Sequence, residues 1–294
     1  MVKKVEDIMN FQKIAGVVIL FNPDKSVIDN IRTYIDKLDI LFVIDNSETV
    51  DEDIIQELKK NKKILYIPNN CNLGIAAALN TGVNCALDRG YKWLFTFDQD
   101  SKVSPTMIKS MIDFLNDNDT SNIGIISPFH SYNDYRPPPN NSRYSDVLIV
   151  PTSGNLLNLN SYIRIGPFLE ELFIDYVDIE FCLRLHLNGY TIIRLNTAIL
   201  LHKLGELKKK RFLHRYIAVT NHNAERMYYR VRNRFYVINK YKYKYPLYCL
   251  SVLKQTLGDV VKIIIYESDK IYKLKMMLLG SFHYIAGKYG KINF

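Results

Sequence analysis

Strand-like and helix-like segments alternate four times within the first hundred residues, and this alternation limits the folds that the chain can adopt. Short apolar, β-branched runs predict strands, and the segments between them repeat apolar residues at helical spacing. The predicted strands are residues 14–20, 40–44, 64–67 and 93–97, and the predicted helices are residues 27–38, 51–60 and 75–88. Such alternation predicts a mostly parallel sheet that is covered by helices on both faces.

Polar residues follow three of the four predicted strands, at residues 22–24, 45–47 and 98–101. In an open α/β sheet, ligands collect outside the carboxyl ends of the strands. The third group contains Asp98 and Asp100, and paired carboxylates are suited to Mg²⁺ or Mn²⁺. The motif therefore predicts a cation site, although a polar turn without a ligand explains it equally well when it is taken alone.

The second half of the chain is less regular. We expect a long loop at residues 129–146, because this segment contains Pro137-Pro138-Pro139. The remaining predicted elements are helices at 105–115, 178–188, 226–239 and 274–285 and strands at 123–127, 147–157 with an interruption at 152–155, 191–195 and 198–201. The expected organisation is a catalytic domain at residues 1–205, with halves at about 12–101 and 102–205, followed by a helical region at 206–294.

The charge of the chain is distributed unevenly. Residues 1–205 carry 20 Lys and Arg against 25 Asp and Glu, and residues 206–294 carry 19 against 5, so −5 and +14 give the net +9. A basic C-terminal region predicts an anionic partner, for which a membrane surface is favoured over nucleic acid because no nucleic-acid recognition motif is present. Four cysteines without a CxxC pair and a charged N-terminus without a signal sequence predict a cytoplasmic protein.

Two further acids stand out in the second half of the chain. Asp178 lies at the start of a predicted helix, where a carboxylate serves either as a simple cap or as a general base. Glu180 is expected to point away from Asp178 and to pair with Arg184, four residues later. His202 follows a predicted strand; alone it is more typical of a structural histidine, and only partnership with the two acids would make it a metal ligand.

The ordered set of these segments resembles family 2 glycosyltransferases of the GT-A fold and, within that family, bacterial rhamnosyltransferases. The resemblance covers about residues 12–235. It rests on Phe21-Asn22-Pro23, Val43-Ile44-Asp45-Asn46-Ser47, Asn72-Leu73-Gly74 through Asn80, Phe97-Asp98-Gln99-Asp100-Ser101, Thr152-Ser153-Gly154-Asn155, Tyr176 through Arg184, His202 through Glu206, and Tyr228-Tyr229-Arg230-Val231-Arg232-Asn233. The chain departs from the pattern at Val177, where many members have Glu before the catalytic Asp.

The resemblance implies a role for each matching residue. Asp178 would be the catalytic base, and Asp100 and His202 would bind Mg²⁺ or Mn²⁺. The nucleotide sugar would be bound by Phe21, Asn22, Asp45, Asn72, Gly74, Asn80, Asp98 and Gln99. The acceptor side or its support would include Gly154, Asn155, Glu180, Arg184 and Arg230.

The implied activity is an inverting transfer of L-rhamnose from dTDP-β-L-rhamnose to a hydroxyl of a bacterial surface-polysaccharide precursor. The implied enzyme is metal-dependent and lies peripherally on the inner face of the cell membrane. One alternative is the same fold with another donor, such as UDP-galactose or UDP-N-acetylglucosamine. The other is a nucleotide-sugar-binding protein without catalysis.

Overall fold

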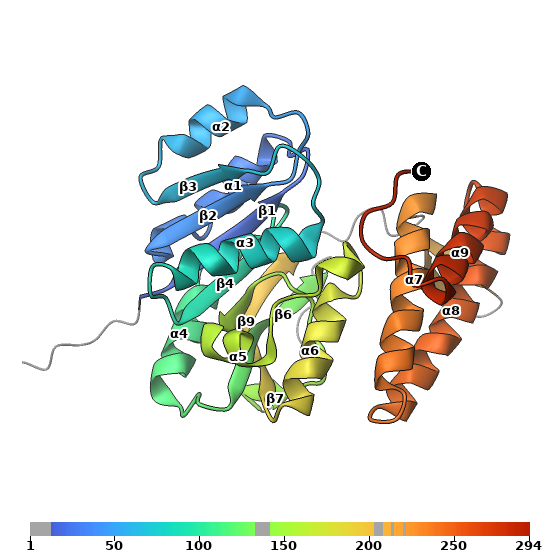
Figure 1. Ribbon diagram of the computed structural model, residues 1–294. Coiled ribbons are helices and arrows are strands. Elements are labelled where there is room, and N and C mark those ends of the chain that lie inside the picture. Colours follow the sequence, from blue (N-terminus) through green and yellow to red (C-terminus); the bar gives the residue numbers. More distant parts are fainter. Residues whose placement is uncertain (1–12, 133–141, 203–207, 213–214, 220–221) are drawn as a thin grey trace, which may run out of the picture.

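The computed structural model of the chain describes residues 13–132, 142–202, 208–212, 215–219 and 222–294 (Figure 1). Its centre is a nine-stranded sheet in which the strand order is β3-β2-β1-β4-β8-β6-β9-β5, with β7 paired to β9. The strands of this sheet are β1 (Ala15–Leu20), β2 (Ile40–Asp45), β3 (Ile64–Pro68), β4 (Trp93–Asp98), β5 (Lys102–Val103), β6 (Ile123–Tyr132), β7 (Tyr144–Asp146), β8 (Asn155–Asn158) and β9 (Thr191–His202).

The sheet is parallel in its first half and mixed in its second half. Strands β3, β2, β1 and β4 pair in parallel, and so do β6 and β9. Strand β8 runs antiparallel to both β4 and β6 and joins the two halves. The parallel pairing expected of the first four strands is therefore confirmed, whereas the sheet as a whole is mixed, because β5 and β7 also pair antiparallel to β9. The parallel half brings the carboxyl ends of β1, β2 and β4 to one edge.

Helices cover both faces of the sheet because successive strand residues point to opposite sides. Val18 packs on the face covered by α1, α2 and α4, whereas Val17 packs on the face covered by α3, α5 and α6. Helix α3 lies especially close to β1, because a Cβ at Gly82 would stand 2.3 Å from the side chain of Val17. The covering elements are α1 (Ser26–Arg32), η1 (Ile35–Lys37), α2 (Glu52–Lys59), α3 (Ile75–Leu87), α4 (Met107–Asp117), α5 (Leu159–Ile165), η2 (Glu170–Leu172) and α6 (Val177–Leu187).

Three long helices follow the sheet and stand beside α6 (Figure 1). They are α7 (Ala224–Tyr241), α8 (Pro246–Tyr266) and α9 (Lys270–Ile285), and they are preceded by a hairpin of β10 (Lys208–Phe212) and β11 (Arg215–Val219). Helix α7 packs closely on α9, because a Cβ at Gly280 would stand 2.5 Å from the carbonyl oxygen of Tyr228. The expected C-terminal helical extension is confirmed. In the described part of the chain, none of the helices is long and apolar enough to span a membrane.

Three expectations for the second half are wrong. The strand expected at residues 147–157 is confined to β8, which begins at Asn155, and residues 147–154 before it are not in a strand. Strand β6 continues to Tyr132, beyond the predicted end at residue 127, so the expected loop begins later. Strand β9 is continuous rather than two short strands. Its pairing with β6 passes from Leu195 opposite Pro128 to Ile199 opposite Phe129, so that residues 196–198 form an irregularity within one strand. Residues 133–141 of the expected loop lie outside the described residues.

Candidate active site

A cavity of about 880 Å³ lies at the carboxyl edge of the parallel strands. One wall is formed by residues at or just after the ends of β1, β2 and β4. A second wall comes from the turn before α3 and from the segment that leads into α6, and α7 and α8 close the remaining side. The polar residues that line the cavity are Asn46, Asn72, Asp98, Gln99, Asp100, Thr152, Asp175, Tyr176, Asp178, His222, Arg226, Arg230 and Gln255.

Asp98 and Asp100 line this cavity together, at the end of β4. The turn between them is fixed by its own side chains. The backbone N–H of Asp98 donates to Ser101 Oγ at 2.9 Å, and Gln99 Oε1 accepts from the backbone N–H of Phe21 at 2.8 Å. Gln99 therefore ties the end of β4 to the end of β1, a structural role that sequence reasoning did not assign to it.

The donor chemistry of these acids fits a hard divalent cation, because carboxylate oxygens are the ligands that Mg²⁺ and Mn²⁺ prefer. Within the part of the chain that the structure describes, no group of three or more His, Cys, Asp or Glu side chains is arranged to hold a metal ion. The backbone of His202 ends β9, but its side chain lies outside the described residues. Its expected role as a metal ligand stays a prediction.

The residues expected to hold the nucleotide divide into two groups. Asn72 and Gly74 line the cavity, and Asn72 Oδ1 accepts from the backbone N–H of Gly74 at 3.0 Å. Gly74 has a φ of +86°, and a Cβ there would stand 2.6 Å from the carbonyl oxygen of Phe173, so only glycine fits this approach. Asn46, the neighbour of Asp45, also lines the cavity and donates to the Gly74 carbonyl at 3.0 Å.

Two other expected nucleotide ligands, Asp45 and Asn22, are not part of the cavity lining. Asp45 is buried outside the cavity lining and accepts from the Ser47 N–H and the Tyr66 hydroxyl, both at 2.8 Å. Phe21 lines the cavity, whereas Asn22 lies beside it and donates its backbone N–H to Ser47 Oγ at 2.7 Å.

Asn80 is a structural residue of the wall and does not line the cavity. Its amide group donates to the Phe168 carbonyl at 2.9 Å and to Glu170 Oε1 at 2.8 Å. Its Oδ1 accepts from the Tyr162 hydroxyl at 2.9 Å and from the Phe168 N–H at 3.0 Å. Both ends of this buried amide are thus engaged within the protein, and Asn80 joins α3 to the segment that follows α5.

Asp178 is the acid whose environment best suits a general base. It lies in the first turn of α6, is half-buried, and faces the same cavity as Asp98. Burial raises the pKa of its carboxyl to about 6. The backbone N–H of Ile179, 2.8 Å from Asp178 Oδ1, acts in the opposite direction, and the charges of Asp175 and Asp98 raise the pKa further. A carboxylate with this pKa is ionised at neutral pH and is more basic than an ordinary aspartate.

The segment before Asp178 has an unusual backbone. Phe173, Asp175 and Tyr176 have φ values of 63°, 60° and 67°, a left-handed region that non-glycine residues rarely occupy. Asp175 forms a two-point ion pair with Arg226, whose Nε and Nη2 lie 3.2 and 3.1 Å from the two carboxylate oxygens. Sequence reasoning missed both residues of this pair, although Asp175 directly precedes the motif from Tyr176 through Arg184 and Arg226 is one helical turn before Arg230.

Helix α7 holds this segment through its buried polar residues. The Asn233 amide group lies 2.8, 2.7 and 2.9 Å from the carbonyl oxygens of Leu172, Ile174 and Asp175. Arg232 Nη2 donates to the Glu171 and Leu172 carbonyls at 3.1 Å each. We call this set of contacts from Arg232 and Asn233 the α7 clasp. Through these contacts, the C-terminal region supports the segment that leads into the candidate active site.

Glu180 is a buried link between α6 and α7. It pairs with Arg184 Nη2 at 2.8 Å, as expected from their spacing, and also with Lys240 Nζ at 2.8 Å. The Tyr241 hydroxyl donates to the same carboxylate at 2.8 Å. Glu180 and Arg184 are not part of the cavity lining, so their place is structural support.

The remaining expected residues are Gly154 and Asn155, which lie beside β4, and Arg230 on α7. Gly154 has a φ of +77° and donates its N–H to the Thr96 carbonyl at 2.6 Å. Asn155 is buried and donates to the Pro151 carbonyl at 2.6 Å, which shapes the lining at Pro151 and Thr152. Arg230 lines the cavity directly and lies 4.0 Å from Asp259.

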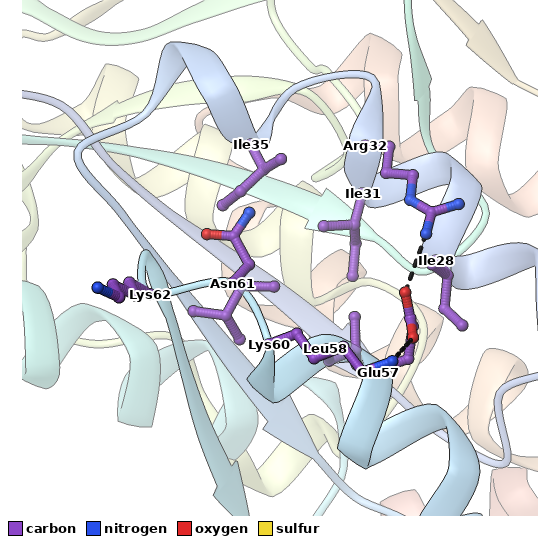
Figure 2. Close-up of a pocket in the computed structure, with 10 residues that line it drawn as sticks. Ile28, Ile31, Arg32, Ile35, Glu57, Leu58, Lys60, Asn61 and Lys62 are labelled. Carbon is purple, nitrogen blue, oxygen red and sulfur yellow. Dashed lines mark hydrogen bonds and ion pairs between the residues drawn. The ribbon is translucent and has the colours of Figure 1, made fainter.

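A separate cavity of about 400 Å³ lies between α1 and α2 (Figure 2). Its lining includes Glu57, which accepts from Arg32 at 3.0 Å and from Lys60 at 2.6 Å. These exposed ion pairs contribute little to stability, and the lining has none of the acids discussed above. Of these two cavities, the larger is therefore the candidate active site.

Comparisons with known proteins agree with this geometry. The sequence model described as "Glycosyl transferase family 2" matches residues 24–169. The dTDP-rhamnosyl transferase RfbF of Shigella flexneri is 26% identical over 290 residues, which cover 93% of this chain and 96% of that protein.

Two solved structures share the fold at 13% sequence identity. Residues 1–349 of S. aureus TarS superpose with a TM-score of 0.60 and cover 93% of this chain and 81% of that chain. GalNAc-T7, solved with UDP, GalNAc and Mn²⁺, superposes with a TM-score of 0.55 and covers 66% of this chain. This chain spans 43% of the GalNAc-T7 chain, so that likeness concerns the shared domain. The expected GT-A fold is confirmed.

Proposed function

Because this chain belongs to glycosyl transferase family 2, we propose that its cavity transfers L-rhamnose from dTDP-β-L-rhamnose to a sugar hydroxyl. The observation that carries the proposal is the placement of Asp98, Asp100 and Asp178 in one cavity, with the pKa of Asp178 raised to about 6. The choice of rhamnose is supported by the likeness to a dTDP-rhamnosyl transferase over nearly the whole chain.

The proposed reaction is a direct displacement with inversion. Asp178 takes the proton of the acceptor hydroxyl, and the oxygen attacks the anomeric carbon while the bond to the diphosphate breaks. The β-linked donor then gives an α-rhamnoside and dTDP. Much of the rate is expected from holding donor and acceptor in line.

A divalent cation is part of this proposal. Mg²⁺ or Mn²⁺ bound at Asp100, with His202 as a further ligand and Asp98 on the donor side, would supply Lewis-acid stabilisation of the diphosphate. On the opposite side of the cavity, Arg226 and Arg230 contribute positive charge toward the same space. The residues of the chain thus provide an acid-rich wall for the cation and a basic wall for anionic groups.

The proposed acceptor is a lipid-linked precursor of a bacterial surface glycan, with the enzyme on the cytoplasmic face of the membrane. The basic balance of residues 206–294 supports an anionic surface as a partner. The acceptor is proposed from the family likeness and from this charge.

The donor can be tested by binding and by product analysis. A donor present at 100 times its dissociation constant stabilises the folded protein by about 2.7 kcal/mol, which a thermal shift detects. We expect dTDP-rhamnose to give the largest shift and to yield a rhamnosylated product by mass spectrometry. Transfer only from UDP-galactose or UDP-N-acetylglucosamine would support the alternative donor, and binding without any transfer would support a non-catalytic protein.

A further inference from the structure

Helix α8 exposes a continuous row of large apolar side chains. Leu250, Leu253, Leu257, Val261 and Ile264 follow one another at intervals of three or four residues, which places them on one side of the helix. All five are exposed, and Leu257 is 69% exposed. The buried residues of the helix, such as Val252 and Ile263, occupy a different side and pack inward.

Helix α9 has a matching row. Ile271, Leu278, Phe282 and Ile285 follow the same spacing, with Lys275 at the intervening position, and Ile271 is 84% exposed. The inward side of α9 holds Met276, Met277 and Gly280. Helices α8 and α9 contact each other as well as α7 (Figure 1). We call the two rows together the apolar C-terminal face.

The packing of this chain does not account for so many exposed apolar side chains on two neighbouring helices. Exposed single apolar side chains are normal, but nine large apolar side chains exposed in two rows on helices that contact each other mark an interaction site. The packing of α8 and α9 on α7 already uses their other sides, so the exposed rows contribute nothing to the hydrophobic core.

The charge around this face indicates its partner. Residues 242–294 contain nine lysines and three acids, and Lys254, Lys270 and Lys275 are exposed on α8 and α9. Two of the acids face cations of the protein: Asp259 lies 2.8 Å from Arg234, and Glu267 lies 2.8 Å from Lys273.

From this combination we propose that the apolar C-terminal face binds an anionic phospholipid surface, with α8 and α9 lying in the plane of the interface. Apolar rows flanked by lysines match the boundary between acyl chains and anionic headgroups, because the apolar side chains enter the acyl region while the lysines attract the headgroups. A second copy of the chain fits less well, since two such faces would bring like charges together.

The apolar C-terminal face adjoins the candidate active site. Gln255 lines the cavity, and its neighbours in the chain, Leu253 and Leu257, belong to the apolar C-terminal face. One helix thus contributes to both surfaces. The use of this face rests on the proposed function: a lipid-linked acceptor would reach the cavity while its lipid stays in the membrane.

The test is binding of the full chain to vesicles of phosphatidylcholine with and without 30% phosphatidylglycerol, measured by flotation. We expect the protein to bind the anionic vesicles, less at high salt, and we expect Leu257→Glu combined with Leu278→Glu to weaken binding at least tenfold. Ile163→Glu is the matched control, because Ile163 is 62% exposed on α5, away from this face, and should bind as the wild type does.

Two measurements keep the outcome clear. The thermal shift caused by the nucleotide-sugar donor should be the same in all variants, which shows that they are folded and tests the donor site separately. Charge reversal by Lys254→Glu with Lys275→Glu should also weaken vesicle binding. The proposal is overturned if the wild type does not float with anionic vesicles, or if sedimentation shows a dimer that Leu257→Glu dissociates.

Discussion

The α7 clasp makes a quantitative prediction about Asn233. In this arrangement one buried side chain supports the carbonyl groups of Leu172, Ile174 and Asp175, directly before the first turn of α6. Replacing Asn233 with Ala removes these contacts and leaves buried carbonyls without this partner. The segment they hold contains three left-handed residues, each of which costs about 1 kcal/mol or more and favours relaxation once the support is gone.

The magnitude follows from the contacts. The Asn233 amide nitrogen has two N–H groups to share among the three carbonyls, and Asn233 Oδ1 accepts from Arg232 Nε at 3.0 Å. Two donated bonds and one accepted bond, each with a net contribution of ~1 kcal/mol, give a loss of about 3 kcal/mol in the free energy of unfolding. Catalysis should suffer separately, because a shift of about 1 Å in a catalytic group costs on the order of 10²-fold in rate. Asp178 follows the supported segment directly, and the fall should therefore appear in kcat rather than in donor binding.

The assay combines urea unfolding with initial rates measured at a temperature where both proteins are fully folded. Asn239→Ala is the matched control, because Asn239 lies on the same helix and is exposed. In the described contacts, its side chain only accepts a hydrogen bond from Lys242 Nζ at 3.0 Å. It should stay within about 0.5 kcal/mol of the wild type. If Asn233→Ala is equally stable, or is destabilised while kcat stays unchanged, the clasp does not position the base.

Further predictions concern the acids of the site. Since burial raises the pKa of Asp178 to about 6, kcat/KM should fall tenfold per unit below pH 6 and level off above it, as a pH–rate profile would show unless another residue is the base. Because the pKa of Asp178 is higher in the folded protein than in the unfolded chain, the folded protein loses stability as the pH rises from about 4 through about 6. Asp178→Asn removes this charge and should therefore raise the free energy of unfolding at pH 7.5, by at most about 3 kcal/mol. An unchanged or lower free energy of unfolding contradicts the burial argument. Glu180→Ala should cost about 3–5 kcal/mol in urea unfolding because it leaves Arg184 and Lys240 without their buried carboxylate, and a loss below 1 kcal/mol would refute that role. Chelation with EDTA should abolish transfer, and Mg²⁺ or Mn²⁺ should restore it; full activity in EDTA would remove the cation from the proposal.

The regular part of the fold could be predicted because periodicity is a local signal. The first four strands and the helices expected at residues 51–60 and 75–88 appear close to their predicted bounds, since burial on both faces of a parallel sheet leaves continuous apolar runs. The single helix expected at residues 27–38 is wrong, because α1 ends at Arg32 and η1 follows as a separate turn. Strand β9 was divided wrongly because Asn196-Thr197 has the composition of a turn. In the structure these residues form an irregularity in a strand that its pairing with β6 keeps continuous.

The site residues that directly follow a recognisable strand could be predicted from the sequence. Contacts between segments far apart in the sequence could not. Asp98 and Asp100 end a recognisable strand, and they share a cavity with Asp178, which begins α6. The contact of Asp175 with Arg226 joins residues 51 apart in the sequence, and Asn233 reaches carbonyls 58 to 61 residues away. Backbone carbonyls carry no sequence signature, and non-glycine residues with positive φ give none either.

The central claim, that Asp178 is the base of a glycosyl transfer, is tested most directly by comparing the wild type with Asp178→Asn. Donor affinity and the rate of product formation from dTDP-rhamnose should be measured separately on both proteins. The account predicts unchanged donor affinity and a transfer rate reduced by about 10²–10⁴-fold at pH 7.5. Transfer at a rate near that of the wild type, with the donor bound equally well, would contradict it.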